Sequence, residues 1–165
     1  MAQKPTFTNI LQVCMVVKDC YATVKTYADK YGIKPWAIYD FTPDTVQDMS
    51  IRGKPQEYAM RLALATVGNV ELELIEPLDD KSDYARFLKE HGEGMHHLGV
   101  EVEDPEKAVE LFQTKGIGVL QGGKWYGTTY TYFDTQKDLA TVIETFTLPP
   151  GFERPEPDDV YPKGA

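Results

Sequence analysis

The segments LQVCMVVKD (11–19) and HHLGVEVED (96–104) decide the fold, because they are two copies of one pattern. Gln12 and His97 each stand seven positions before the aspartate that closes the segment, and an amphipathic helical pattern follows each aspartate. An aspartate directly before an apolar-periodic run is a typical helix N-cap. The two segments therefore predict a strand followed by a helix, and they predict that this unit occurs twice.

Each unit continues with three further strand-like runs, separated by turn-rich or polar stretches. Gly32 and Gly116 mark the ends of the two predicted helices. The pattern is β-α-β-β-β in both halves, which predicts an α+β fold with a cup-shaped, eight-stranded mixed sheet. The six further strands are expected in KPWAIYDFT, EYAMRLALATV, NVELELIE, GIGVLQGG, TTYTYFDT and LATVIETFTL.

We expect one domain, because a chain of 165 residues can bury roughly two-thirds of its unfolded surface in a single core. Its parts are module one (9–78), a connecting helix (79–93), module two (94–148) and an extended tail (149–165). The tail is rich in proline and poor in apolar residues. We interpret it as an extended surface arm rather than as an ordered cover over a substrate.

Composition narrows the classes of function. The formal net charge of −9 and the absence of a basic run disfavour binding to nucleic acid or to an anionic membrane. The two cysteines form neither a CxxC pair nor a disulfide framework, which favours a reducing compartment. No apolar run approaches the length of a membrane span. A cytoplasmic protein is the expectation.

Four side chains are the candidate functional residues. Gln12 and His97 begin the first strand of each half, and Glu73 and Glu144 lie in the last strand of each half. A polar side chain that faces the inside of a sheet is costly unless it is paired or bound to a metal. Two carboxylates, an amide and an imidazole at equivalent positions of a repeat indicate one divalent metal ion held between the halves.

Simpler interpretations compete with this one. Gln12 can be a polar strand end and Glu73 a solvated residue of an amphipathic strand. Glu71 shares a strand face with Glu73 and is the competing ligand. His96 and His97 are expected to point to opposite faces, so that at most one enters the site, and His96 is expected to be packed or hydrogen-bonded.

Three more side chains share the expected inner face. Cys14 lies near the site by strand parity, although a buried cysteine usually acts as a small apolar side chain. Tyr130 and Tyr132 lie on one face of a late strand and are expected either to pack in the core or to line a pocket.

A duplicated β-α-β-β-β unit with ligands on its first and last strands resembles the vicinal oxygen chelate superfamily, which includes glyoxalase I, methylmalonyl-CoA epimerase and extradiol dioxygenases. The likeness covers residues 9–148. The stretches GMHHLGVEVEDPEKAVELF and VELELIEPL look most like methylmalonyl-CoA epimerases. The ligand order Gln12, Glu73, His97, Glu144 is similar to that of eukaryotic glyoxalase I.

The chain departs from both relatives at particular positions. Glyoxalase I has glutathione-binding Arg and Asn residues where this chain has Val16 and Pro77. The epimerases commonly have a second carboxylate base on the third strand of the first half. Here that strand offers only Glu57 at its edge and Arg61 inside.

The resemblance implies a metal-dependent isomerase or epimerase that abstracts a proton next to a metal-chelated carbonyl. Glu144 is the expected base and Glu73 its partner on the opposite side. The alternatives are a glyoxalase I-like lactoylglutathione lyase and a metal-free small-molecule binding or resistance protein. Dioxygenase chemistry is disfavoured, because redox iron prefers two histidines and one carboxylate.

The resemblance also bears on cofactors and partners. The ligands suit Zn, Ni, Co, Mn, Mg or Fe(II), and they leave the identity of the metal open. The expected partner is a small-molecule substrate with two neighbouring oxygens, with CoA thioesters among the candidates. A homodimer is expected by analogy and from exposed strand edges.

Overall fold

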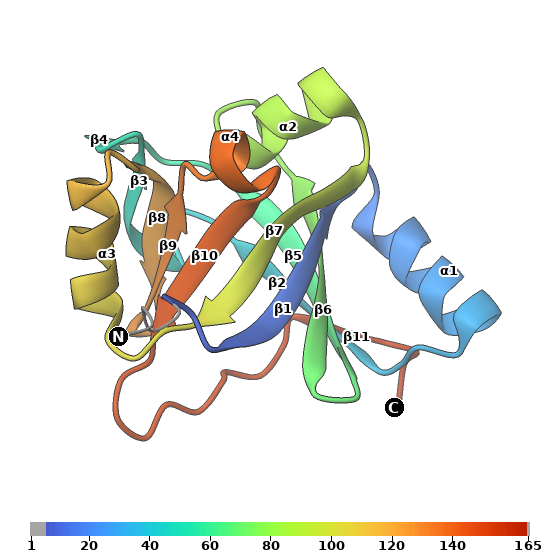
Figure 1. Ribbon diagram of the computed structural model, residues 1–165. Helices are drawn as coiled ribbons and strands as arrows, with labels where there is room; N and C mark the ends of the chain where they lie inside the picture. The colour runs from blue at the N-terminus through green and yellow to red at the C-terminus, as the bar shows by residue number, and fades with distance from the viewer. Residues whose placement is uncertain (1–5, 165) are drawn as a thin grey trace.

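The computed structural model describes residues 6–164 and contains one eleven-stranded, strongly curled sheet (Figure 1). The first five residues and Ala165, the last residue of the predicted tail, lie outside the described residues. The strands are β1 (Asn9–Val16), β2 (Trp36–Phe41), β3 (Val46–Ile51), β4 (Lys54–Pro55), β5 (Met60–Val67), β6 (Val70–Pro77), β7 (Gly94–Glu101), β8 (Val119–Trp125), β9 (Thr128–Phe133), β10 (Val142–Thr147) and β11 (Asp159–Tyr161). The helices are α1 (Cys20–Tyr31), α2 (Asp83–His91), α3 (Pro105–Thr114) and α4 (Gln136–Leu139).

The strand order shows the duplication directly. It runs β11-β2-β5-β6-β1-β7-β10-β9-β8-β3-β4, so the first strands of the two modules, β1 and β7, lie side by side at the centre. They pair antiparallel, and each pairs on its other side with the last strand of its own module, in parallel. The predicted α+β fold with two β-α-β-β-β modules is confirmed, and all eight predicted strands are present.

The predicted number of strands is too low, because β3, β4 and β11 join the sheet as well. The sequence that contains β3 predicts turns rather than a strand. Only Val46 and Met49 of this strand are buried, and their spacing of three does not follow the two-residue period of a strand. Its pairing with β8 is interrupted by an irregularity between Gln47 and Ser50, where Asp48 has a φ of 53°. A bulge of this kind breaks the two-residue period on which strand prediction depends.

The two main helices begin as the sequence indicates. The side chain of Asp19 accepts a hydrogen bond from the backbone N–H of Ala22, and that of Asp104 accepts one from Lys107. Gly32 ends α1 in the left-handed conformation, with a φ of 70°, which only glycine adopts at little cost. The described residues contain no helix that is long and apolar enough to cross a lipid bilayer.

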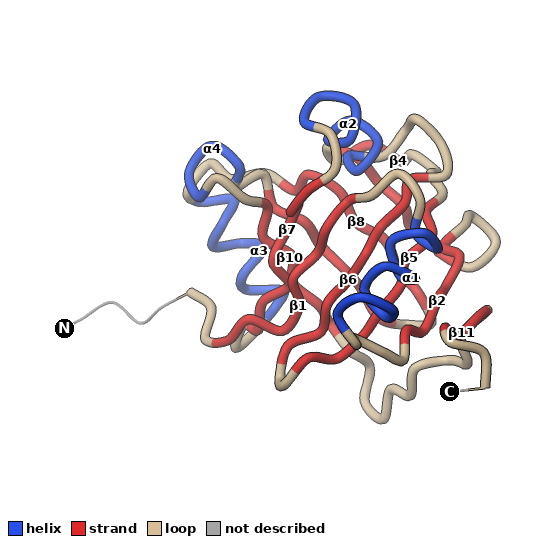
Figure 2. The backbone as a smooth tube through the Cα atoms, turned by 90° about the vertical axis from the view of Figure 1, so that its right-hand side faces the viewer, coloured by secondary structure: helices blue, strands red, loops and turns tan. Residues whose placement is uncertain are grey.

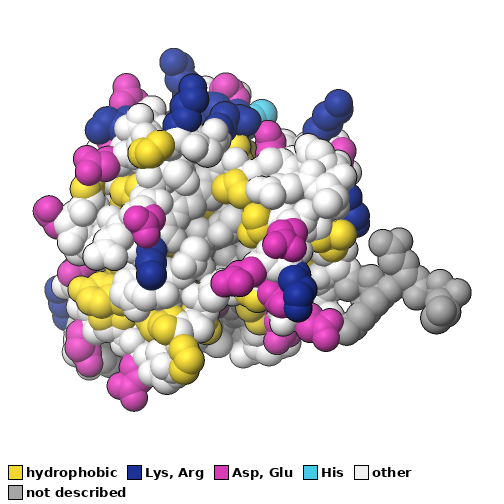
Figure 3. All heavy atoms as spheres, turned by 90° about the vertical axis from the view of Figure 1, so that its left-hand side faces the viewer, with side chains coloured by type: hydrophobic (Ala, Val, Ile, Leu, Met, Phe, Trp, Pro, Cys, Tyr) yellow, Lys and Arg dark blue, Asp and Glu magenta, His cyan; other side chains and the backbone are white. Residues whose placement is uncertain are grey.

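Helices α1 and α3 cover the outer side of the curled sheet, while α2 packs at one end of its inner side through Tyr84. One apolar cluster lies between α1 and the sheet and includes Val24 and Leu74, and another, with Phe112 and Phe133, lies beneath α3. The largest cluster lines the inner side. Acidic and basic side chains are interspersed over the face that carries α3 (Figure 3).

The tail after β10 runs along one edge of the molecule and returns to the sheet (Figures 1 and 2). Its last part forms β11, which pairs antiparallel with β2, and the Tyr39 hydroxyl donates a hydrogen bond to the carbonyl of Pro155 (3.2 Å). Phe152 and Arg154 line the main cavity. The tail is extended as predicted, and it also contributes to the wall of a cavity, which its composition does not indicate.

Replacing Leu74 by alanine tests the packing beneath α1. Leu74 is fully buried in the centre of β6, so Leu74→Ala is expected to lower the free energy of unfolding by about 2–5 kcal/mol. Urea unfolding followed by circular dichroism measures this change. The control is Leu78→Ala, because Leu78 is 41% exposed. Equal losses for both variants would contradict the described core.

Candidate metal centre

Four polar side chains from four adjacent strands meet on the inner side of the sheet. Glu73 comes from β6, Gln12 from β1, His97 from β7 and Glu144 from β10. All four are buried, and His97 is completely inaccessible. His97 Nε2 lies 3.1 Å from Glu73 Oε2 and 3.0 Å from Glu144 Oε2. The structure therefore brings together the four residues that the repeat singles out.

The atoms that face one another have no hydrogen-bond partner. Gln12 Oε1, Glu73 Oε2, His97 Nε2 and Glu144 Oε2 are all buried and unpaired, although two of the distances are those of ion pairs. Buried carboxylates without a partner are costly. Two ligand atoms about 2.1 Å from one cation and at right angles to each other would lie about 3 Å apart. The donor set thus fits a divalent cation in its chemistry, and the two distances from His97 Nε2 to the carboxylates fit the spacing of neighbouring ligands.

The amide of Gln12 is oriented by Glu71, the competing candidate of the sequence analysis. Gln12 Nε2 donates to Glu71 Oε1 (2.5 Å), which leaves the amide oxygen as the atom that faces the other ligands. Glu71 is itself held by both guanidinium nitrogens of Arg154 from the tail, at 2.8 and 3.1 Å. Glu71 therefore contacts the Gln12 amide, and Glu73 is the carboxylate that faces His97.

Cys14 lies beside the centre, as strand parity indicates. Its Sγ, a carboxylate oxygen of Glu73 and a ring nitrogen of His97 lie within 4.8 Å of one another. Burial strongly raises the pKa of the Cys14 thiol, so the side chain is neutral at physiological pH. Burial also raises the pKa of Glu144, and the neighbouring Glu73 adds to this effect.

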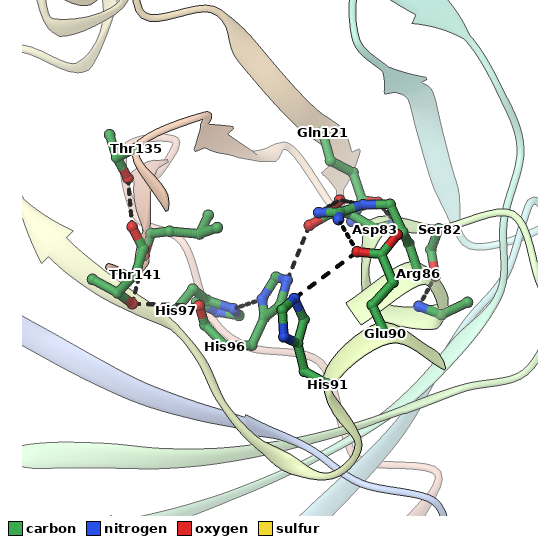
Figure 4. A network of polar contacts seen from close by, with 12 residues as sticks. Ser82, Asp83, Arg86, Glu90, His91, His96, His97, Gln121, Thr135 and Thr141 are labelled. Atoms are coloured by element: carbon green, nitrogen blue, oxygen red, sulfur yellow. Dashed lines mark hydrogen bonds and ion pairs between the residues drawn. The ribbon is translucent and has the colours of Figure 1, made fainter. Parts of the chain in front are cut away.

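Behind His97, a buried network leads to the connecting helix (Figure 4). His97 Nδ1 lies 2.9 Å from His96 Nδ1, and His96 Nε2 lies 3.1 Å from Asp83 Oδ2. Arg86 Nε donates to the other oxygen of Asp83 (2.8 Å). Burial lowers the pKa of His96 and favours the neutral ring. Burial alone would raise the pKa of Asp83, but His96 and Arg86 outweigh it and lower this pKa.

For the neutral form of His97, these contacts select the tautomer of both rings. The ionised Asp83 accepts the N–H at Nε2 of His96, so Nδ1 of the neutral His96 accepts the N–H at Nδ1 of His97. Nε2 of His97 then carries the lone pair that faces Glu73 and Glu144. This is the tautomer that a metal ligand requires, and metal-bound histidines commonly have such an outer hydrogen bond.

His96 is hydrogen-bonded, as predicted, but its position relative to His97 differs from the prediction. The two rings do not point to opposite faces, since their Nδ1 atoms are in contact. The pairing of β1 with β7 shifts register between Cys14 and Met15, at the position of this pair. Such an irregularity breaks the alternation of side chains. Asp83 was not predicted, because no local pattern relates it to His97.

The centre opens into a cavity of about 640 Å³. Gln12, Glu73 and Glu144 line it. Tyr130 and Tyr132 line it as well, so of the two predicted alternatives, core packing or pocket wall, they take part in the pocket wall. The close packing of Phe146 and Gln12 against β7 requires glycine at position 99. A Cβ there would lie 2.9 Å from Phe146 Cε2 and 3.0 Å from Gln12 Cβ.

Known proteins are similar to this chain in sequence. A model of the Glyoxalase/Bleomycin resistance protein/Dioxygenase superfamily matches residues 11–133. The mitochondrial methylmalonyl-CoA epimerase of Bos taurus is 35% identical over 65 residues, which are 39% of this chain and 37% of that protein. The ethylmalonyl-CoA/methylmalonyl-CoA epimerase of Cereibacter sphaeroides is 28% identical over 113 residues, 68% of this chain and 74% of that protein. The chain matches little more than a third of the length of the bovine relative.

Solved structures show the same fold. The methylmalonyl-CoA epimerase of Mycobacterium tuberculosis superposes with a TM-score of 0.65 at 20% identity, over 88% of this chain and 91% of that one. A variant of the Streptomyces coelicolor methylmalonyl-CoA epimerase in complex with 2-nitronate-propionyl-CoA gives 0.62 at 22% identity, over 86% and 97%.

The paired modules and the polar cluster between them define the class of two-module proteins with a site on the inner side of one curled sheet. The chain belongs to the Glyoxalase/Bleomycin resistance protein/Dioxygenase superfamily. Its curated relatives include epimerases and a 4-hydroxyphenylpyruvate dioxygenase of Legionella pneumophila, all of them enzymes.

Asp83→Asn tests the outer hydrogen bonds of His97. Loss of the charge on Asp83 weakens the contact that holds His96, so the affinity for Zn²⁺ is expected to fall about 10- to 100-fold in chelator competition. Glu90→Gln is the matched control, because Glu90 binds the same Arg86 from an exposed position (2.7 Å) and does not contact His96. Equal Zn²⁺ affinities for Asp83→Asn and wild type would rule out the positioning role.

Gly99→Ala tests the packing beside Gln12. The added Cβ must displace Phe146 or Gln12, so Zn²⁺ affinity is expected to fall at least tenfold while the circular dichroism spectrum is retained. Gly94→Ala is the control on the same strand, since a Cβ at Gly94 would meet nothing within 4 Å. Equal Zn²⁺ affinities for Gly99→Ala and Gly94→Ala would contradict the expected effect of the Gly99 packing.

Proposed function

We propose that the protein is a metal-dependent isomerase or epimerase that moves a proton at a carbon next to a chelated carbonyl. The observation that supports this most strongly is the pair of buried carboxylates, Glu73 and Glu144, whose unpaired oxygens lie about equally far from His97 Nε2. Gln12 and these three residues would hold the cation. A divalent cation bound there would polarise the carbonyl oxygen and stabilise negative charge on an enolate.

Glu144 is the proposed base. Burial raises its pKa, which makes its carboxylate a stronger proton acceptor than an exposed glutamate. Glu144 would take the proton from the substrate carbon, and the electrons of the C–H bond would remain on the enolate. Glu73, on the other side of His97, would deliver a proton taken up from solvent to the opposite face of the same carbon, which gives epimerisation.

No carboxylate on β5 competes for this role. Glu57 precedes the strand and lines a separate surface hollow, while Arg61 is bound by Asp40 through two hydrogen bonds of 2.7 and 2.8 Å. Neither residue lines the main cavity. Glu73 and Glu144 are therefore the two carboxylates that we propose move the proton.

Methylmalonyl-CoA is the first substrate to assay, because several curated relatives and structural neighbours are named as methylmalonyl-CoA epimerases. The second candidate is a lactoylglutathione lyase, since the ligand order resembles glyoxalase I and return of the proton to the neighbouring carbon needs the same two carboxylates. Val16, at one of the two glutathione positions, is fully buried and has no polar atom to offer glutathione. We therefore place the epimerase first. Homodimerisation remains a prediction, which sedimentation at micromolar concentration tests.

Glu144→Gln is expected to keep the fold and to lose turnover by at least 10²-fold, because the amide cannot accept the proton. The measurement is deuterium uptake from solvent at C2 of methylmalonyl-CoA, with conversion of a hemithioacetal assayed in parallel. Glu110→Gln, an exposed change on α3, is the control. Full turnover by Glu144→Gln would refute the assignment of the base. Activity on the hemithioacetal alone would reverse the order of the two functions.

A further inference from the structure

We propose that the substrate is an elongated molecule with three parts: a chelating head, a neutral apolar body and a hydrogen-bonding group at the far end that meets Thr128. The head rests on the proposed function. The body and the far end are inferred independently, from the walls of the cavity.

One strand forms the length of the cavity wall. Thr128, Tyr130 and Tyr132 alternate along β9, so they share one face, and all three line the cavity. Tyr132 pairs with Glu144 and therefore marks the end with the candidate metal centre. Thr128 lies four residues further along the strand, a distance of about 13 Å. A ligand that fills this cavity is long rather than compact.

The middle of the cavity is apolar. Leu62 and Leu64 face it from β5, and the rings of Trp125 and Phe146 contribute from β8 and β10. The hydroxyl of Tyr130 is already engaged by the hydroxyl of Tyr58 (2.8 Å). Aromatic and aliphatic walls without free polar atoms bind apolar groups, because these lose contact with water on entry.

The charges exclude an anionic body. Among the described residues that line the cavity, Arg154 is the only basic one, and Glu71 holds it with two hydrogen bonds. The remaining charged lining residues are Glu73, Glu101 and Glu144. A phosphate or a second carboxylate along this wall would meet acidic groups with no free cation to offset them. The body is therefore neutral.

Among the described residues that line this cavity, Thr128 is the one on the β9 wall away from the candidate metal centre whose buried side-chain oxygen has no hydrogen-bond partner. The residue is 8% exposed, and its hydroxyl oxygen is buried without a hydrogen-bond partner. Tyr126 and Gly127, with φ values of 47° and 85°, form the two-residue turn that places Thr128 at the start of β9. A buried hydroxyl without a partner is costly, and Thr128 lines the cavity. A hydroxyl or carbonyl on the ligand fits this position.

Three hydroxamates test the proposal on the Zn²⁺-loaded protein, because a hydroxamate chelates through two neighbouring oxygens. Acetohydroxamate carries the head alone, 4-phenylbutanoyl hydroxamate adds the body, and its 4-hydroxyphenyl analogue adds the far group. By calorimetry, the body is expected to raise affinity at least tenfold. The phenolic hydroxyl is expected to add about three- to tenfold.

Thr128→Val replaces the hydroxyl with a methyl group. In this variant the preference for the phenol over the phenyl compound is expected to disappear, while the phenyl compound binds as well as in wild type or better. Thr129→Val, one residue along and on the other face of β9, is the matched control and should keep the preference. An unchanged preference in Thr128→Val, or no gain from the phenyl group, would overturn the proposal.

The same comparison without the head separates this proposal from the proposed function. Binding of 4-butylphenol and butylbenzene to the metal-free protein, measured by NMR, depends on the wall alone. A Thr128-dependent preference for the phenol there supports the wall even if acetohydroxamate fails to bind, which would count against the metal centre. Equal binding of both compounds to wild type and to Thr128→Val would reject the inferred body and far end.

Discussion

The structure depends on the balance of charge at one buried point. Glu73 and Glu144 place carboxylate oxygens 3.1 and 3.0 Å from Nε2 of His97, in a place that water does not reach. Burial alone would lower the pKa of His97, but the Glu144 carboxylate beside its ring holds this pKa well above its ordinary value. The site therefore requires positive charge, and a proton or a divalent cation can provide it. A cation also pairs the oxygen of Gln12, which a proton on His97 does not.

The duplicated fold explains how this charge arrangement is built. β1 and β7 pair at the centre of the sheet, and the last strand of each module flanks them. Each module thus delivers one carboxylate to the same point, together with the amide of Gln12 or the imidazole of His97. Two outer networks hold the amide and the imidazole: Arg154 and Glu71 orient Gln12 from the tail, and Asp83 and His96 orient His97 from α2. The two segments outside the repeat, the tail and the connecting helix, are the ones that support this cluster.

Much of this arrangement is visible in the sequence, because it is local or repeated. The spacing of Gln12 and His97 to their capping aspartates predicts both modules, and strand parity predicts which side chains face inward. The rest depends on contacts between distant segments. β3 is hidden by its polar side chains and its bulge, and β11 by the proline-rich tail in which it lies. The roles of Asp83 and Arg154 follow from contacts across 13 and 83 residues, which no local pattern encodes.

The most direct test of the central claim is a crystal structure of the protein grown with Zn²⁺, with anomalous diffraction measured at the zinc edge. The account predicts a single strong peak between the two modules, about 2.0–2.2 Å from His97 Nε2 and from oxygens of Gln12, Glu73 and Glu144. No peak at this position, or a zinc ion held by other residues, would contradict it.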